Sequence, residues 1–176
     1  MTKRDTIEIL RHTRHDWLNK IQLIKANLTL QRFERIDELI EEIVMEAQHE
    51  SSLSNINAPK LAELFLTFHW DPKMFKLEYE VWNSDINLGE FDEALYYTFI
   101  SMFDMLEEVL DEINDNNLLV SIQKDENIIR FFFDISGIIK KKASVEKWFA
   151  EQSLFNVENK TINEKECTFE CILHSK

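Results

Sequence analysis

The chain has 176 residues, is 44% hydrophobic and carries a formal net charge of −13 at pH 7. The hydrophobic content suffices for a packed core and excludes a disordered chain, and the negative charge argues against general nucleic-acid binding. Only two glycines and two prolines are present, which disfavours glycine-built phosphate loops and turn-rich all-β folds and favours long helices.

The basic residues are concentrated at the N-terminal end. Residues 1–32 contain seven Lys or Arg and three Asp or Glu, whereas residues 33–50 contain one basic and seven acidic residues. A basic segment in an acidic chain indicates a partner surface that is acidic or phosphorylated. No signal-peptide core and no apolar run of membrane-spanning length is visible, so we expect a cytoplasmic protein that binds neither membrane nor nucleic acid.

Apolar residues recur with helical period over residues 5–28 and again over residues 36–47. The first stripe consists of Ile7, Leu10, Trp17, Ile21, Ile24 and Leu28. The second consists of Ile36, Leu39, Ile40, Ile43, Val44 and Ala47. The short segment between them predicts an antiparallel helical hairpin. A lone hairpin cannot enclose both stripes, so we expect a homodimer in which residues 1–50 of each copy build a four-helix bundle.

A cluster of small polar residues at 51–59, closed by a proline, predicts a domain boundary. We expect a phosphotransfer and dimerisation hairpin over 1–52 and an α/β domain over 58–176. The second domain is predicted to contain helices at 59–69, 91–113 and 144–152, and strands at 76–83, 117–125, 127–136 and 167–174. This mixture, with a local strand hairpin, predicts an α+β sandwich with a mixed or antiparallel sheet.

His15 lies in the stretch "RHDWLNKIQ", residues 14–22, on the first predicted helix. At 100° per residue it points away from the apolar stripe, so we expect an exposed imidazole. Leu18, Asn19 and Gln22 fall within about 60° of it, one and two turns further along. An exposed imidazole with one unprotonated nitrogen is a suitable nucleophile for a phosphoryl group, so His15 is the candidate catalytic residue.

Charged and amide side chains near this histidine have predicted supporting roles. Arg11, Arg14 and Lys20 are expected to lie close enough to attract a negatively charged phosphate donor. Asn19 is placed to hydrogen-bond the attacking group or a phosphoryl oxygen. Asp16 lies about 100° round the helix, so we expect it to orient the imidazole only across the edge of the turn or from a dimer partner.

The surface around His15 is also the predicted partner-binding patch. We assign to it Arg11, His12, Leu18 and Gln22. A histidine on a solvated helix face more often has no function, and this simpler interpretation competes with the catalytic one. We adopt the simpler interpretation for the other histidines, which are His12, His49, His69 and His174. His12 lies at the edge of the face that carries His15 and is also a candidate partner contact.

The two cysteines, Cys167 and Cys171, lie four residues apart on a predicted strand. That spacing separates them by about 13 Å, which is too far for a disulfide. No further metal-ligand residues surround them in the pattern of a structural zinc site. We therefore expect two buried, reduced thiols and no metal site.

The stretch "RHDWLNKIQLIKANLTLQRFERIDELIEEI", residues 14–43, resembles the histidine-bearing hairpin of the sporulation initiation phosphotransferase B family of spore-forming bacteria. The resemblance continues through "HESSLSNI", "FLTFHW" and "LEYEV", spans most of the chain and is densest in residues 10–82. It implies a dimeric four-helix bundle carrying a phosphorylatable histidine, which corresponds to His15, and a C-terminal domain shaped like the ATP-binding domain of histidine kinases.

The resemblance also implies an activity. Such a protein takes phosphate from the aspartate of one response regulator and passes it to the aspartate of a second regulator that controls sporulation. We expect no cofactor of its own and expect the regulator partner to supply Mg²⁺.

Two alternatives remain: an ATP-dependent histidine kinase, and a non-catalytic dimeric scaffold or inhibitor with a kinase-like shape. A kinase needs a magnesium-binding asparagine on its long helix and glycine-rich segments around the nucleotide. The long predicted helix has no asparagine before Asn114, and Gly89 and Gly137 are the only glycines. Asp134, in "FDISG", is better interpreted as a strand residue before a turn. We therefore do not expect ATP binding.

Overall fold

The computed structural model describes residues 6–83 and 85–174, and it divides into two compact units between Gln48 and His49. The first five residues of the predicted hairpin, residue 84, and the last two residues of the predicted second domain lie outside the described residues. Among the described residues, no helix is both long and apolar enough to cross a bilayer.

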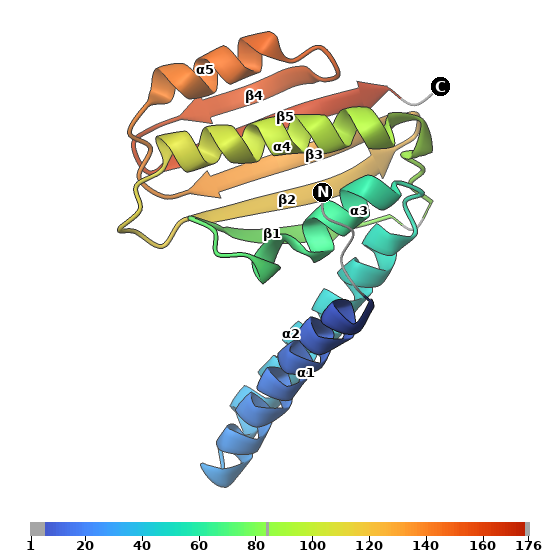
Figure 1. Cartoon of the computed structure of the whole chain (residues 1–176), viewed down its shortest axis with the longest axis vertical. Coiled ribbons are helices and arrows are strands. Elements are labelled where there is room, and N and C mark those ends of the chain that lie inside the picture. The colour runs from blue at the N-terminus through green and yellow to red at the C-terminus, as the bar shows by residue number, and fades with distance from the viewer. Residues whose placement is uncertain (1–5, 84, 175–176) are drawn as a thin grey trace. The chain divides into compact units, whose positions relative to one another are not determined.

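The N-terminal unit is a helical hairpin, as predicted. Helix α1 spans Thr6–Thr29 and helix α2 spans Phe33–Ser54 (Figure 1). Gln31 turns the chain between them with a φ of 55°. No residue of α1 is buried, and the exposed fraction is 49% for Trp17 and 55% for Ile21. One hairpin by itself therefore leaves the apolar stripe of α1 largely uncovered.

Helix α2 is longer than predicted. Residues 51–54, which we placed in the domain boundary, continue the helix. Leu53 is fully buried in the core of the second unit, and the Ser54 hydroxyl donates a hydrogen bond of 2.8 Å to the Glu50 carbonyl oxygen. A hydroxyl bonded to the carbonyl one turn back slightly destabilises a helix, so burial of Leu53, and not this bond, extends α2 through these serines. The small polar composition therefore did not mark the end of this helix.

A five-stranded sheet forms the base of the second unit, in the order β1-β2-β3-β5-β4. The strands span, in chain order, Lys76–Val81, Asn117–Asp125, Ile128–Ser136, Asn156–Ile162 and Glu166–His174. β1 runs parallel to β2, and every other neighbouring pair is antiparallel. The sheet is therefore mixed, as predicted.

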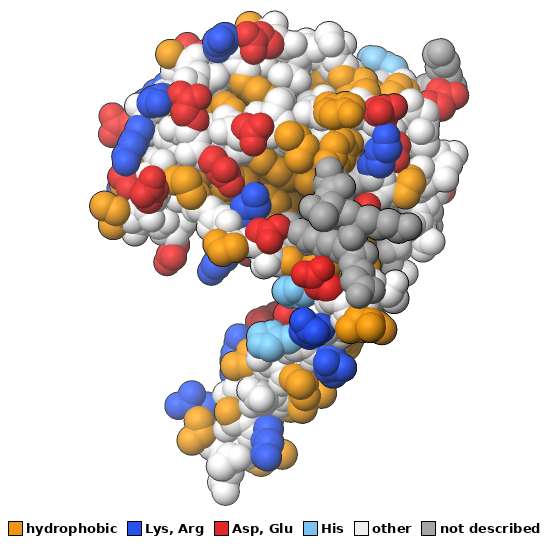
Figure 2. All heavy atoms as spheres, in the orientation of Figure 1, with side chains coloured by type: hydrophobic (Ala, Val, Ile, Leu, Met, Phe, Trp, Pro, Cys, Tyr) orange, Lys and Arg blue, Asp and Glu red, His pale blue; other side chains and the backbone are white. Residues whose placement is uncertain are grey.

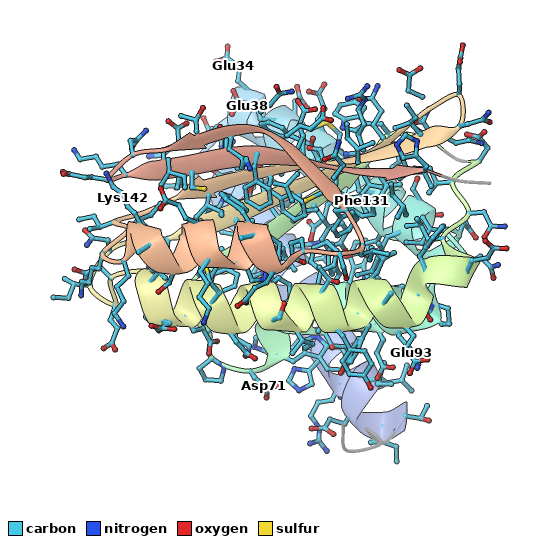
Figure 3. The ribbon with its side chains drawn as sticks, turned by 90° about the horizontal axis from the view of Figure 1, so that it is seen from above. Glu34, Glu38, Asp71, Glu93, Phe131 and Lys142 are labelled. Atoms are coloured by element: carbon cyan, nitrogen blue, oxygen red, sulfur yellow. The ribbon has the colours of Figure 1, made fainter. Side chains whose placement is uncertain are left out.

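Three helices cover one face of this sheet: α3 at Pro59–Leu66, α4 at Asp92–Val109 and α5 at Lys142–Glu151 (Figure 1). Aromatic side chains fill the space between the two layers, and the largest fully buried ones are Phe65, Phe99, Phe131, Phe133 and Phe169. Figure 3 shows Phe131 between the sheet and the helices. Burial of these rings supplies much of the driving force for folding. The predicted α+β sandwich is confirmed.

Two predicted helices in this unit end early. Helix α4 stops at Val109, not at residue 113, because Leu110 leaves the helix to form a bridge with Ile139. Helix α3 stops at Leu66, and a separate 3₁₀ turn follows at Phe68–Trp70. The early end of α4 comes from a contact between distant residues, which a helical period does not encode.

The edge strand β4 was not predicted. Its sequence, "NVENKTI", has only two apolar residues, Val157 and Ile162. A register shift between Glu158 and Thr161 breaks the alternation, and Asn159 within it has a φ of 49°. A bulge of this kind adds a residue to one strand, so the two-residue period is lost.

Candidate functional site

His15 projects into solvent from the middle of α1. Its side chain is 72% exposed, which confirms the prediction made from its angular position. Since α1 contains neither glycine nor proline, the histidine is carried on an uninterrupted helix. The ring is therefore held on a regular backbone and is open to a large partner.

Asn19 lies one helical turn beyond His15 and contacts its ring. The side-chain Nδ2 of Asn19 is 3.2 Å from Nδ1 of His15. Residues four apart on a helix are neighbours on its surface, which explains the contact. The two ends of an asparagine amide are assigned from their surroundings, so the amide can donate to Nδ1 or, when turned over, accept a proton from it.

Asp16 also reaches the ring from within the same chain. Its Oδ1 lies 3.6 Å from Nδ1 of His15, which is an ion-pair distance but longer than a hydrogen bond. We expected this carboxylate to approach only across the edge of the turn or from a dimer partner, and the first route is the one found. Nδ1 thus has two polar neighbours, and among the described residues Nε2 of His15 has no hydrogen-bond partner.

The remaining predicted site residues surround the histidine on α1. Arg11, Arg14 and Gln22 are exposed, Leu18 is 49% exposed and His12 is half-buried. Figure 2 shows histidine side chains beside Lys and Arg on the visible face of the hairpin. The patch is therefore basic and partly apolar, and it is accessible in the single chain.

Lys20 does not join this patch. Its Nζ lies 2.7 Å from Oε2 of Glu46 on α2 and 5.6 Å from the centre of the Trp17 ring. The expectation that Lys20 would attract the phosphate donor is therefore not supported, because its charge is already paired across the hairpin. Sequence reasoning missed Glu46, although opposite charges on facing helices were a signal that could have found it.

Two histidines of the second unit have structural contacts. His49 Nδ1 accepts a hydrogen bond of 3.1 Å from the backbone N–H of Val81, and His69 Nε2 lies 2.8 Å from the carbonyl oxygen of Leu77. Both contacts fall on β1. His174 is exposed at the end of β5.

The cysteines are free and buried, as predicted. Burial raises the pKa of the Cys167 thiol to about 12 and that of Cys171 to about 12. Thiols in this state are poor nucleophiles and poor metal ligands. No group of three His, Cys, Asp or Glu side chains that could hold a metal ion occurs within residues 6–83 and 85–174.

The helical layer of the second unit is filled by aromatic side chains where α4 meets α5. Trp148 of α5 donates a hydrogen bond of 3.0 Å from Nε1 to the Ser101 hydroxyl of α4, and its indole is 6% exposed.

Asp134 lies between Phe133 and Ile135, both of which face this core, so its carboxylate points to the opposite face of the sheet. Desolvation, with a smaller contribution from Glu166, raises the pKa of Asp134.

Comparisons with known proteins match both units. The family model described as the sensor kinase SpoOB-type alpha-helical domain matches residues 1–56, and that described as the C-terminal part of sporulation initiation phosphotransferase B matches residues 57–174. Sporulation initiation phosphotransferase B of Bacillus subtilis (strain 168) is 44% identical over 121 residues, which cover 69% of this chain. The alignment spans 63% of that relative's length.

Solved structures of histidine kinases are similar at lower identity. The catalytic domain of the histidine kinase ThkA is 12% identical, with a TM-score of 0.48, and the match covers 69% of this chain and 93% of that one. A structure of ThkA in complex with the response regulator protein TrrA is 14% identical, with a TM-score of 0.46, over 96% of this chain and 61% of that one.

Proposed function

Because the chain belongs to the sporulation initiation phosphotransferase B family, we propose that it is a histidine phosphotransferase of a sporulation phosphorelay. It takes a phosphoryl group from the aspartyl phosphate of one response regulator onto His15 and passes it to the aspartate of a second regulator. The observation that carries this proposal is the exposed ring of His15, whose Nδ1 has two polar neighbours while Nε2 has no hydrogen-bond partner among the described residues.

The contacts at Nδ1 suit Nε2 as the attacking atom. Attack requires a lone pair on Nε2, so the single proton of the neutral ring must sit on Nδ1. The Asn19 amide, turned so that its oxygen faces the ring, accepts that proton, and the Asp16 carboxylate lies 3.6 Å from the same nitrogen. Together these two side chains favour the reactive tautomer.

The proposed transfer is balanced without any other reactant. The Nε2 lone pair forms the N–P bond as the bond between phosphorus and the aspartyl oxygen breaks, and the aspartate leaves as a carboxylate with the electron pair. The ring, protonated at Nδ1, gains positive charge, which the Asp16 carboxylate stabilises. The second transfer runs the same steps in reverse onto a new carboxylate. Both the acyl phosphate and the phosphohistidine are reactive phosphates, so no nucleotide is needed.

The chain supplies the nucleophile and its placement, and we propose that the regulator supplies Mg²⁺. A phosphoryl group in transfer carries charge that a cation stabilises. The partner patch of Arg11, His12, Leu18 and Gln22 would contribute electrostatic attraction and apolar contact around the incoming phosphate. Helix α4 contains no asparagine, the residue that a kinase would use on this helix to bind magnesium, and this supports a phosphotransferase and not a kinase.

We propose that the chain acts as a homodimer. The exposed apolar stripe of α1 supports this, since large side chains such as Leu10, Trp17 and Ile21 are 49–60% exposed in the single chain. Pairing two hairpins into a four-helix bundle would bury them. The bundle would leave His15 outside, because it lies away from the stripe.

The test is transfer of labelled phosphate from an aspartyl-phosphorylated response regulator in the absence of ATP. We expect acid-labile, base-stable label on this protein, and its loss in His15→Gln. The matched control is His174→Gln, an exposed histidine at the end of β5 and outside the partner patch, which should retain the label. Regulator binding without any label would favour the scaffold or inhibitor, and labelling from ATP without a regulator would favour a kinase.

A further inference from the structure

The sheet of the second unit has two edge strands that differ in how they are protected. On β1, His69 contacts the carbonyl oxygen of Leu77 and His49 accepts a hydrogen bond from the N–H of Val81. Imidazoles thus occupy backbone groups on β1, which pairs with β2 alone among the strands of the described residues. An edge whose backbone is occupied in this way is closed to a further strand.

The opposite edge, β4, has no such protection. β4 pairs with β5 alone, and within the part of the chain that the structure describes no side chain hydrogen-bonds to its backbone. The bulge between Glu158 and Thr161 and the charge of Lys160 are features that limit indiscriminate pairing. The backbone on the outer side of β4 therefore remains able to bind an added strand of suitable sequence.

A groove of about 440 Å³ runs beside this edge, between β4 and α5. Its lining consists of Glu146, Phe149 and Ala150 from α5, and Lys160 and Ile162 from β4. Figure 1 shows α5 and β4 as neighbours at one margin of the unit.

The groove has an apolar floor and a charge of opposite sign on each wall. Phe149 packs edge-on against Phe169 of the core at 4.8 Å between ring centres, which fixes the floor. Lys160 Nζ lies 5.6 Å from the centre of the Phe149 ring, on the strand side. Glu146 has no ion pair among the described residues and stands on the helix side.

We propose that this groove binds an extended segment of a partner protein by strand addition to β4. A helix alongside an open edge strand is the arrangement used by domains that bind peptides in this way. Side chains of an added strand alternate between the two faces, about 6.8 Å apart on each face. The bound segment therefore places an apolar residue over Phe149 and Ile162, a basic side chain toward Glu146 and an acidic side chain toward Lys160.

This site is separate from His15 and does not rest on the proposed phosphotransfer. The probe is a fluorescein-labelled, end-capped peptide, Thr-Lys-Thr-Val-Thr-Glu-Thr, titrated into the full-length protein. We expect saturable binding, amide shifts confined to α5 and β4 in a ¹⁵N-resolved NMR spectrum, and slower hydrogen exchange in β4. His15→Gln should bind the peptide equally well, so failure of phosphotransfer and failure of peptide binding are distinguishable.

Variants of α5 test the placement. Ala150→Trp fills the groove at an exposed position and should weaken binding at least tenfold, and Glu146→Lys should reverse the preference between this peptide and one with two glutamates. Lys147→Trp, on the same helix but outside the groove, should bind as the unchanged protein does. Absence of binding at millimolar peptide, or equal binding by Ala150→Trp, would overturn the proposal. Equal binding of a peptide methylated on its backbone nitrogens would also overturn it, because strand addition needs those N–H groups.

Discussion

The side-chain amide of Asn19 lies 3.2 Å from Nδ1 of His15, one helical turn away and on the same exposed face. With the amide oxygen turned toward the ring, this contact holds the proton of the neutral imidazole on Nδ1 and leaves Nε2 to react. Asp16, at 3.6 Å from the same atom, adds negative charge but no hydrogen bond of ordinary length.

Asn19→Ala should lower the rate of phosphotransfer about tenfold, which corresponds to about 1.4 kcal/mol of transition-state free energy. The loss should appear in the single-turnover rate and not in the affinity for the regulator, because the amide holds the ring. Asn27→Ala is the matched control, since Asn27 also bonds one turn back on α1, to the Leu23 carbonyl oxygen at 2.9 Å, away from the histidine. Equal rates for Asn19→Ala and the unchanged protein would remove Asn19 from the mechanism.

Ile21→Asp should convert the protein from dimer to monomer, as measured by sedimentation velocity. Ile21 is 55% exposed in the single chain and belongs to the stripe that the bundle would bury. A carboxylate at that position would be buried without a partner, which is strongly unfavourable. A dimer that survived this substitution would contradict the proposed interface.

Leu18→Asp should leave the dimer intact and weaken regulator binding by about tenfold or more, since a central apolar contact at an interface often contributes this much. Leu18 is 49% exposed, the same as Trp17 beside it, but lies on the face of His15. The pair Leu18→Asp and Ile21→Asp therefore separates docking from dimerisation. Unchanged regulator affinity in a calorimetric titration would place the docking surface elsewhere.

Gly137→Ala should destabilise the protein by about 2 kcal/mol or more. The residue has a φ of 150°, and an added Cβ would lie 2.2 Å from Oδ1 of Asn116. Asn116 cannot move aside easily, because it is 3% exposed and its Nδ2 donates to the carbonyl oxygens of Met74 and Asp111. Urea denaturation would measure the loss of stability.

The matched control for that substitution is Gly89→Ala. Its added Cβ would meet Nδ2 of Asn57 at 2.6 Å, but Asn57 is an exposed side chain. It should therefore cost clearly less than Gly137→Ala. Equal losses for the two variants would show that the buried asparagine is not the cause.

The stability of the second unit should fall in acid partly through Asp111. The backbone N–H of Ile113 and the ammonium of Lys140 lower the pKa of the Asp111 carboxyl. A carboxyl whose pKa is lower in the folded state contributes stability above its unfolded pKa of about 3.9, and that contribution is lost as the pH falls through the folded pKa.

Asp111→Asn should therefore narrow the stability difference between neutral pH and pH ~3, measured by urea denaturation at each pH. Lys140→Met should remove part of the same dependence, because it deletes the ion pair of 3.1 Å but leaves the backbone hydrogen bond. Parallel pH profiles for all three proteins would contradict this assignment.

The apolar period of residues 5–28 was enough to predict helix α1 and the exposure of His15, because both depend only on the angle between neighbouring residues. The same local rules predicted the β2–β3 hairpin, whose strands alternate, and the mixed sheet. The resemblance in residues 14–43 predicted the family to which the chain belongs, and the family models that match residues 1–56 and 57–174 confirm it.

Contacts between residues distant in the sequence decided three features that the sequence did not predict: the ion pair of Lys20, the extension of α2 and the strand β4. Lys20 pairs with Glu46 because the hairpin brings the two helices together, so a charge expected at the site is held elsewhere. Burial of Leu53 in the second unit extends α2 through a polar segment that would otherwise end it. β4 exists because β5 offers it a hydrogen-bonding partner, although its own sequence has little strand pattern. In each case the free energy comes from a residue distant in the chain, which no local period can encode.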